Sequence, residues 1–440
     1  MNPRRLSIVM ALCASCAGPS RLQPGEGAPA GHEASAARPA ATPAAPPRSA
    51  PAAVAPVASP APVPVLPFDE AVAAAADMLF STARLSAGAP PFTLVIDPLI
   101  DGVTGEQSHA TRSMGDRIAS IVRSKYSSFE IEPFNRQTVA RSPIVLIGTF
   151  TPVGRGGKTE GPREAYRICL ALIDLRSGRV VGRGWARARM TGVDATPGAF
   201  FRDSPTWAED ASVDGYVRTC QSSQIGGPID PVYLDRILLS ALVNEALDAY
   251  DAGHYAEALE TYREAQHMAG GADEARVLNG LYMAHYKLGH MEAASEDFSR
   301  IVDHGLARKQ LAVKFLFAPG STGFWRDPAV SGPYPVWLQR IAQRSAAANS
   351  CLEISGHTSP TGPEPLNKRL SQRRAEVIRE RLAAMAPLLN EHTVAFGMGS
   401  SENLVGTGRD DASDALDRRV AFKVVDCRTG QAKATRYRPP

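Results

Sequence analysis

The most informative candidate for binding chemistry is Arg374, in the stretch GHTSPTGPEPLNKRLSQRRAEVIRERL that begins at Gly356. On a helix, Arg374 shares a face with Leu370, four residues before it, and Ile378, four residues after it. A guanidinium on an apolar face is poorly solvated, and a carboxylate would satisfy its planar fork with two hydrogen bonds. From its position alone, such an Arg is expected to be solvated or paired within the chain, and a carboxylate-binding Arg is the alternative that only the surrounding motif favours.

Hydrolytic chemistry has little support in the sequence, because no Gly-x-Ser-x-Gly, His-Glu-x-x-His or Cys/His arrangement is present. His357 and Ser359 come nearest, but two residues apart in a turn they fit a structural role. The loop GRGGKTEG after Val153 has Pro152 where a phosphate-binding loop needs Gly, and no helix pattern follows it. We therefore expect a non-enzyme with no cofactor and no metal.

The composition is that of a globular chain with several cores: 440 residues, 44% of them hydrophobic, with a formal net charge of +3. The 48 Lys and Arg residues are scattered among 45 Asp and Glu residues rather than clustered on one face. This balance argues against a nucleic-acid partner.

The N-terminus has the layout of a secretory signal, with Arg4 and Arg5 followed by a short apolar run over residues 6–14. Two small residues directly before Cys16 resemble the lipobox of bacterial lipoproteins, although Cys13 stands where that pattern usually has Leu. The resemblance implies that residues 1–16 are a lipoprotein signal and that Cys16 carries the lipid anchor. The alternative is an ordinary cleaved signal that leaves a free Cys.

Residues 17–66 alternate Ala and Pro, which removes backbone donors and offers few large side chains to bury. We expect a disordered, semi-extended tether. If it is polyproline-like, its reach is on the order of 100 to 150 Å.

Four Cys residues follow the signal, two in each of two folded regions, and an exported compartment permits disulfides. We predict two bonds, Cys169 with Cys220 and Cys351 with Cys427. Four buried free thiols are the alternative.

The fold class that we expect is multidomain α/β, beginning with an α/β sandwich over residues 67–227. Helical spacing runs over 68–85 and 110–126, strand patterns over 92–100, 129–134 and 143–153, and a hairpin over 166–190. In organisation, this order resembles the periplasmic lipoprotein domains of the CsgG, FlgO and LpoB type.

A central helical region is expected over residues 228–305, because two stretches superpose at a shift of 36 residues. It resembles two tetratricopeptide repeats, a type that binds peptides or partner proteins, and two ordinary helical hairpins are the alternative. Two repeats rarely bury a core alone, so we expect the region to pack on a neighbour. The matched pairs are Gly253 with Gly289, Ala258 with Ala294, and Tyr262 with Phe298.

The third region, over residues 306–428, predicts a sandwich in the order β-α-β-α-β with one further strand, followed by a basic tail over 429–440. Its short motifs, taken in order, resemble the peptidoglycan-binding OmpA-like domain. Those motifs are Gly356-His357-Thr358, Gly362, Asn367, Leu370-Ser371, Arg374-Ala375, Gly397-x-Gly399 and Arg418-Arg419-Val420.

The resemblance implies a pocket for the diaminopimelate of a peptidoglycan stem peptide, with an Arg binding its carboxylate and an Asp its ammonium. The Asp is replaced here by Ser359, the Asn before the two Arg residues is replaced by Asp417, and Glu364 is a candidate for the missing carboxylate. The predicted peptidoglycan-binding residues are Gly356, His357, Thr358, Ser359, Asn367, Leu370, Arg374, Arg418 and Arg419.

Together these features predict a non-catalytic outer-membrane lipoprotein on the periplasmic face, which tethers that membrane to peptidoglycan. The helical repeats and the N-terminal domain would recruit an envelope protein partner. The alternative is an adaptor whose OmpA-like domain has lost peptidoglycan binding and serves as a protein-interaction module.

Overall fold

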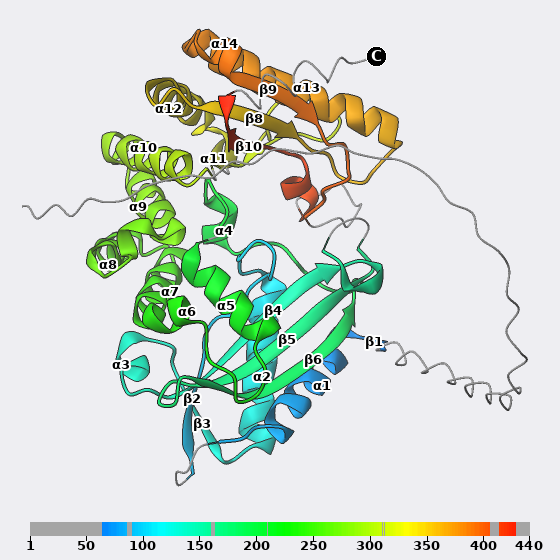
Figure 1. Cartoon of the computed structure of the whole chain (residues 1–440), viewed down its shortest axis with the longest axis vertical. Coiled ribbons are helices and arrows are strands. Elements are labelled where there is room, and N and C mark those ends of the chain that lie inside the picture. Colours follow the sequence, from blue (N-terminus) through cyan, green and yellow to red (C-terminus); the bar gives the residue numbers. More distant parts are fainter. Residues whose placement is uncertain are drawn as a thin grey trace, which may run out of the picture. The chain divides into compact units, whose positions relative to one another are not determined.

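The computed structural model describes residues 64–85, 90–159, 163–208, 210–309, 311, 313–404 and 413–427. The predicted signal segment, the lipidation site Cys16, residues 17–63 of the predicted tether and the predicted tail over 429–440 lie outside these ranges. Within the described ranges, no helix combines the length and the apolar character that a membrane crossing needs. The protein is a mixed α/β structure (Figure 1).

The N-terminal region forms a six-stranded sheet in the order β1-β6-β5-β4-β2-β3. Strands β4, β5 and β6 are antiparallel neighbours, whereas β2 is parallel to both β3 and β4. The elements are β1 (Val65–Leu66), α1 (Phe68–Ser81), β2 (Phe92–Ile96), α2 (His109–Lys125), β3 (Phe129–Glu132), α3 (Arg136–Val139), β4 (Ile144–Val153), a 3-10 turn (Arg155–Gly157), β5 (Ala165–Asp174), β6 (Arg179–Arg189), α4 (Ala199–Asp203) and α5 (Ala211–Ser222).

Both faces of this sheet are covered, since α1 and α2 pack on one face and α5 packs on the other (Figure 1). Helix α2 starts where the sequence favours it, because Ser108 and Thr111 form a reciprocal capping box. Helix α1 lies very close to β6, where a Cβ on Gly184 would overlap the Ala75 carbonyl oxygen. The predicted helices and strands of this region are therefore present as an α/β sandwich.

One boundary of the predicted tether is wrong. Val65 and Leu66 form β1, which pairs in parallel with Arg187 and Ala188 at the edge of the sheet. Strand pairing gives their backbone groups partners that an Ala/Pro-rich chain lacks in isolation. The ordered chain therefore begins before residue 67.

The central region consists of α6 (Pro231–Asp235), α7 (Ile237–Asp251), α8 (Tyr255–His267), a 3-10 turn (Gly271–Asp273), α9 (Ala275–Lys287) and α10 (Met291–Ala307). Each of α7 to α10 packs on the next. Gly253 and Gly289 have φ values of 81° and 76°, the left-handed conformation that ends α7 and α9. Tyr262 and Phe298, the matched aromatic residues of the two hairpins, are both fully buried.

The C-terminal region forms a four-stranded sheet in the order β7-β10-β8-β9, with β8 and β9 parallel and β10 antiparallel to β7 and β8. Its predicted order of strands and helices is confirmed, although the first strand, β7, is shorter than the segment that the sequence pattern indicates. The elements are β7 (Phe315–Leu316), α11 (Pro328–Ser331), α12 (Tyr334–Ala347), β8 (Cys351–Gly356), α13 (Glu364–Met385), α14 (Leu389–His392), β9 (Thr393–Gly397), a 3-10 turn (Ser413–Asp417) and β10 (Arg419–Val425).

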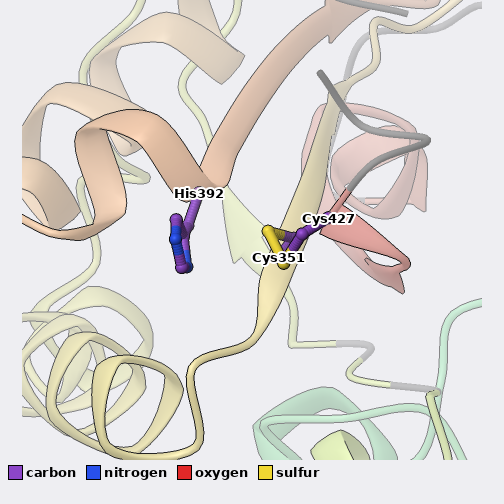
Figure 2. Close-up of side chains that lie close together, drawn as sticks. All are labelled: Cys351, His392 and Cys427. Atoms are coloured by element: carbon purple, nitrogen blue, oxygen red, sulfur yellow. A yellow bond between two sulfur atoms is a disulfide. The ribbon is translucent and has the colours of Figure 1, made fainter. Parts of the chain in front are cut away.

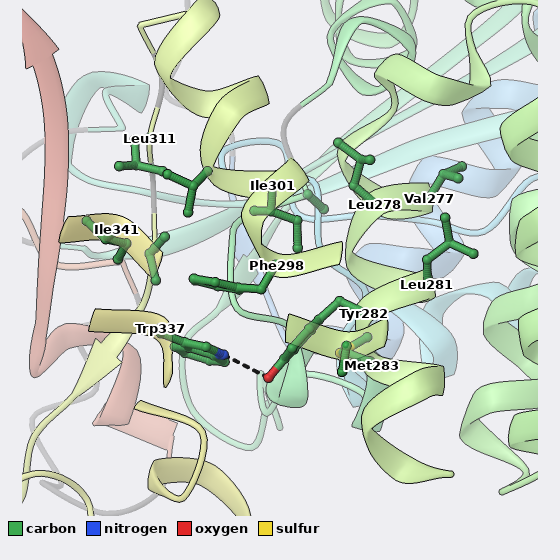
Figure 3. Packing of buried hydrophobic residues seen from close by; sticks show 14 of the residues in the cluster. Val277, Leu278, Leu281, Tyr282, Met283, Phe298, Ile301, Leu311, Trp337 and Ile341 are labelled. Carbon is green, nitrogen blue, oxygen red and sulfur yellow. Dashed lines mark hydrogen bonds between the residues drawn. The ribbon is translucent and has the colours of Figure 1, made fainter. Parts of the chain in front are cut away.

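The helical region shares one hydrophobic core with the C-terminal sheet and its helices (Figure 3). Trp337 of α12 is central to the contact, because its ring stacks on Phe298 with centroids 5.3 Å apart and its indole N–H donates to the Tyr282 hydroxyl at 2.7 Å. The two helical hairpins thus pack on a neighbouring element, as expected, and that element is α12.

The structure contains one of the two predicted disulfides. Cys351, at the start of β8, is bonded to Cys427, just after the neighbouring strand β10. The predicted bond between Cys169 and Cys220 is wrong, because both are free thiols with sulfur atoms 2.7 Å apart. A disulfide needs about 2.05 Å, and here the Cys169 thiol donates instead to the Cys220 carbonyl oxygen.

We predict that Trp337→Ala lowers the free energy of unfolding by about 3–5 kcal/mol, because it leaves a cavity between α10 and α12 and removes the donor to Tyr282. Urea denaturation of the purified protein measures the change. Val336→Ala is the control, since Val336 is 42% exposed and should change stability by only about 0.5 kcal/mol. Equal stability of the two variants would contradict a shared core.

Candidate functional site

The predicted binding residues gather around the loop that follows β8, between the start of α13 and the start of β10. The His357 amide donates to the Arg419 carbonyl oxygen at 2.8 Å, and the Thr358 amide donates to the Gly399 carbonyl oxygen at 2.9 Å. Helix α13 crosses this end of the sheet so closely that a Cβ on Gly356 would overlap the Ser371 carbonyl oxygen. Glycine in this motif is therefore required by packing.

Arg374 is fully buried and already has three acceptors. Its Nε, Nη1 and Nη2 atoms each donate a hydrogen bond to a backbone carbonyl oxygen at a distance of 2.9 Å. The guanidinium carbon lies 5.3 Å from the centre of the Phe317 ring. The geometry therefore supports the interpretation that Arg374 is paired within the chain. Its guanidinium is not exposed to bind the carboxylate of a ligand. The acceptors belong to Ser321, His357 and Ala318.

Arg418 and Arg419 are also buried, with exposed fractions of 1% and 6%. Arg418 lies over the Trp325 ring at 5.2 Å and donates to the Phe317 carbonyl oxygen. Arg419 donates to the Glu402 carbonyl oxygen, and burial lowers its pKa to about 10 despite the opposing charge of nearby acids. Both cations hold the loops around β7 and β10 together.

Two polar atoms of the loop are buried and have no hydrogen-bond partner among the described residues, namely His357 Nδ1 and Thr358 Oγ1. The Glu402 carboxylate lies 3.6 Å from His357 Nδ1, which is beyond hydrogen-bond distance. Burial, with the nearby Arg419 guanidinium, lowers the pKa of His357 well below its usual value. The ring is therefore neutral at pH 7, with Nδ1 open to a further polar group.

The other predicted residues lie at the same end of the sheet. Ser359 is buried, and its hydroxyl lies 3.0 Å from the Thr361 hydroxyl. Asn367 is also buried and donates to the Gly362 carbonyl oxygen at 3.4 Å, while Leu370 is half-buried.

Glu364, considered as a substitute for the missing Asp, is exposed and accepts hydrogen bonds from the Ser400 amide and hydroxyl. It links the start of α13 to the turn after β9, whereas Nε, Nη1 and Nη2 of Arg374 each donate to a backbone carbonyl oxygen. Glu364 therefore does not close a salt bridge over Arg374.

The sequence interpretation missed Glu402 and Asn403. The Glu402 side chain is 54% exposed beside His357, and Asn403 Nδ2 donates to the Thr358 carbonyl oxygen at 2.8 Å. Both lie within four residues after Gly399 of the Gly397-x-Gly399 motif, so their place in the sequence was a usable signal.

Cys351, Cys427 and His392 lie close enough to suggest a metal centre, with their ligand atoms all within 4.8 Å of one another (Figure 2). In the structure, however, the two sulfur atoms form a disulfide, and metal binding needs thiolates. The cluster is therefore a bonded pair with a neighbouring His ring.

No protein-family model and no curated protein matches the chain. Solved structures do match a part of it, and they are envelope proteins. The peptidoglycan-associated lipoprotein of Burkholderia pseudomallei is 27% identical over 26% of this chain and 89% of its own, with a TM-score of 0.21. The cell wall anchor of the T6SS from Pseudomonas aeruginosa is 22% identical over 29% of this chain and 95% of its own, with a TM-score of 0.22.

A third similar structure is the periplasmic domain of Helicobacter pylori MotB, which is 14% identical over 28% of this chain and 83% of its own, with a TM-score of 0.20. Each of the three matches thus covers less than a third of this chain.

We predict that Arg374→Met destabilises the protein by about 3 kcal/mol or more, because it leaves three buried carbonyl oxygens without their charged donor. Chemical denaturation measures the loss. The control is Arg373→Met, since the Arg373 side chain is 65% exposed and should change stability by only about 0.5 kcal/mol. A stable Arg374→Met protein would contradict a structural role for this guanidinium.

We also predict that stability falls in acid through His357. Its folded-state pKa is depressed, so below about pH 6.5 the unfolded chain binds a proton that the folded protein does not. The free energy of unfolding should drop by about 1.4 kcal/mol per pH unit from this residue alone. Unfolding curves from pH 7 to pH 5 for wild type and His357→Gln measure the difference, and parallel curves would contradict the prediction.

Proposed function

We propose that this chain is a cell-envelope protein whose C-terminal domain binds a peptidoglycan stem peptide at the loop of residues 357–361. The observation that carries the proposal is a pair of buried polar atoms, His357 Nδ1 and Thr358 Oγ1, which have no hydrogen-bond partner in the described part of the chain and lie in the loop that the OmpA-like motif assigns to the ligand. Buried polar groups are nearly always hydrogen-bonded, so such a pair fits a site that a further group completes.

The roles within the site differ from the family pattern. Arg374 positions the loop through its bond to the His357 carbonyl oxygen and is not the group that meets a carboxylate. Glu402, whose side chain is 54% exposed and lies 3.6 Å from His357 Nδ1, replaces the missing Asp as the acceptor for the diaminopimelate ammonium. Neutral His357 and Thr358 then offer polar atoms to the rest of the ligand.

The remaining parts of the proposed function rest on the sequence. A lipid on Cys16 holds the chain in the outer membrane, the Ala/Pro-rich segment provides reach, and the C-terminal domain binds the wall. Two linked attachments raise each other's effective concentration, so modest affinity at the wall suffices. The tetratricopeptide-like helices and the N-terminal domain then recruit an envelope protein.

A second candidate function is an adaptor whose C-terminal domain contacts a protein and no longer binds the wall. Two observations favour it: Ser359 provides no charge for an ammonium, and the Arg374 guanidinium is bound to three carbonyl oxygens. The two functions differ in whether purified peptidoglycan retains the protein.

We expect Thr358→Val to weaken retention on purified sacculi by about fivefold or more, since the change keeps the side-chain shape and removes a hydroxyl that has no partner among the described residues. Co-sedimentation over a range of sacculus concentrations measures the affinity. Thr261→Val on α8 is the control, because it makes the same change at a half-buried Thr outside the loop, and it should leave retention unchanged.

Ser359→Asp restores the family's acid and should strengthen retention, and a misfolded domain would not mimic that gain. Thermal unfolding of each variant shows whether it is folded. If sacculi retain neither wild type nor Ser359→Asp, the wall-binding function is wrong and the adaptor function replaces it.

A further inference from the structure

A cavity of about 850 Å³ lies in the N-terminal region, far in sequence from the loop at β8. The residues around it come from the end of α1 and the chain after it, the end of β4 and the 3-10 turn that follows, β5, β6, and the end of α5 with the chain after it. Its described lining holds four Arg residues and neither Asp nor Glu. Those residues are Arg84, Arg167, Arg183 and Arg187.

Sheet register concentrates positive charge on one face. Arg167 of β5 lies directly opposite Arg187 of β6, and Arg183 lies four residues before Arg187 on the same face of β6. Like charges directly opposite each other destabilise a sheet. The arrangement is therefore unfavourable unless a further group balances the charge.

The protein itself balances little of that charge. Arg183 donates to the Cys220 carbonyl oxygen at 2.8 Å and so caps the end of α5, and Arg167 donates to Gln221 Oε1 at 3.0 Å. Within the described part of the chain, none of the four Arg residues has a salt bridge, and Arg187 Nε is buried without any hydrogen-bond partner.

The positive charge also acts on Cys169, which is one of the residues that line the cavity. The hydrogen bond from Cys220 lowers the pKa of the Cys169 thiol, and Arg183 and Arg167 lower it further against the effect of burial. At the rim, Trp185 is 50% exposed between Arg183 and Arg187 along β6. The cavity thus combines several unneutralised guanidiniums with an aromatic wall.

We propose that this cavity binds a ligand that carries two or more phosphate groups. Guanidinium forks pair with phosphate through two parallel hydrogen bonds, and an anion bridging Arg167 and Arg187 would remove their repulsion. One phosphate can meet only part of the four cations, whereas a diphosphate spans both strands. The exposed Trp185 ring then contacts an apolar or ring-shaped part of the ligand.

Isothermal titration calorimetry of the purified full chain with inorganic pyrophosphate tests the proposal. We expect Arg167→Gln and Arg187→Gln each to weaken binding by about ten- to a hundredfold, the loss of a charge-assisted hydrogen-bonded pair. Arg189→Gln is the control, because Arg189 is exposed on the same strand and outside the cavity lining. Thermal unfolding of the free proteins should show that both cavity variants fold, since each removes a like-charge contact.

Two further probes identify the source of the phosphate. Retention on vesicles that contain cardiolipin, a lipid with two phosphate groups, but not on phosphatidylcholine vesicles, lost in Arg187→Gln, would assign the site to a lipid headgroup. Pyrophosphate binding without vesicle binding would assign it to a free phosphorylated molecule. Binding of neither, equal affinity of wild type and Arg187→Gln for pyrophosphate, or citrate bound as tightly as pyrophosphate would overturn the proposal.

Discussion

The C-terminal domain depends on one buried charge, the guanidinium of Arg374. A cation taken out of water is costly unless its donors are satisfied, and three carbonyl oxygens from two separate loops satisfy it here. The bonds tie the segment after β7 to the loop after β8, with α13 supplying the cation. Gly356 lets α13 approach closely enough for this, because any side chain there would overlap the helix backbone. The shape of the candidate binding loop is thus a consequence of this network.

The molecule uses Arg in two physically different ways. At the end of the C-terminal sheet, Arg374 and Arg419 are buried and donate hydrogen bonds to carbonyl oxygens, which holds the neighbouring loops together. On the N-terminal sheet, Arg167 and Arg187 face each other across neighbouring strands with few acceptors nearby. Residue type is the same in both places, and the supply of acceptors decides whether the charge is structural or available to a ligand.

Local patterns in the sequence were sufficient for most elements. The repeat of Met114, Ile118 and Val122 places one apolar face on α2, and the long apolar run of β4 marks a strand buried on both sides. The C-terminal motifs also placed their residues correctly at one end of one sheet, since turn, helix start and strand start are all local signals. The bond between Cys351 and Cys427 followed from pairing the Cys residues within each region.

What the sequence by itself determined, then, was the order of elements and most, but not all, of the polar residues that meet at the loop after β8. Only the tertiary structure decided whether Arg374 is open to a ligand, because its acceptors at Ala318 and Ser321 lie more than fifty residues away and carry no side-chain signal. The same holds for the thiols of Cys169 and Cys220 and for the Arg-lined cavity. The helical and strand periods of a sequence indicate only which residues within a few positions share a face. The number of hydrogen-bond acceptors around a side chain, and whether it is buried, depend on how distant segments pack.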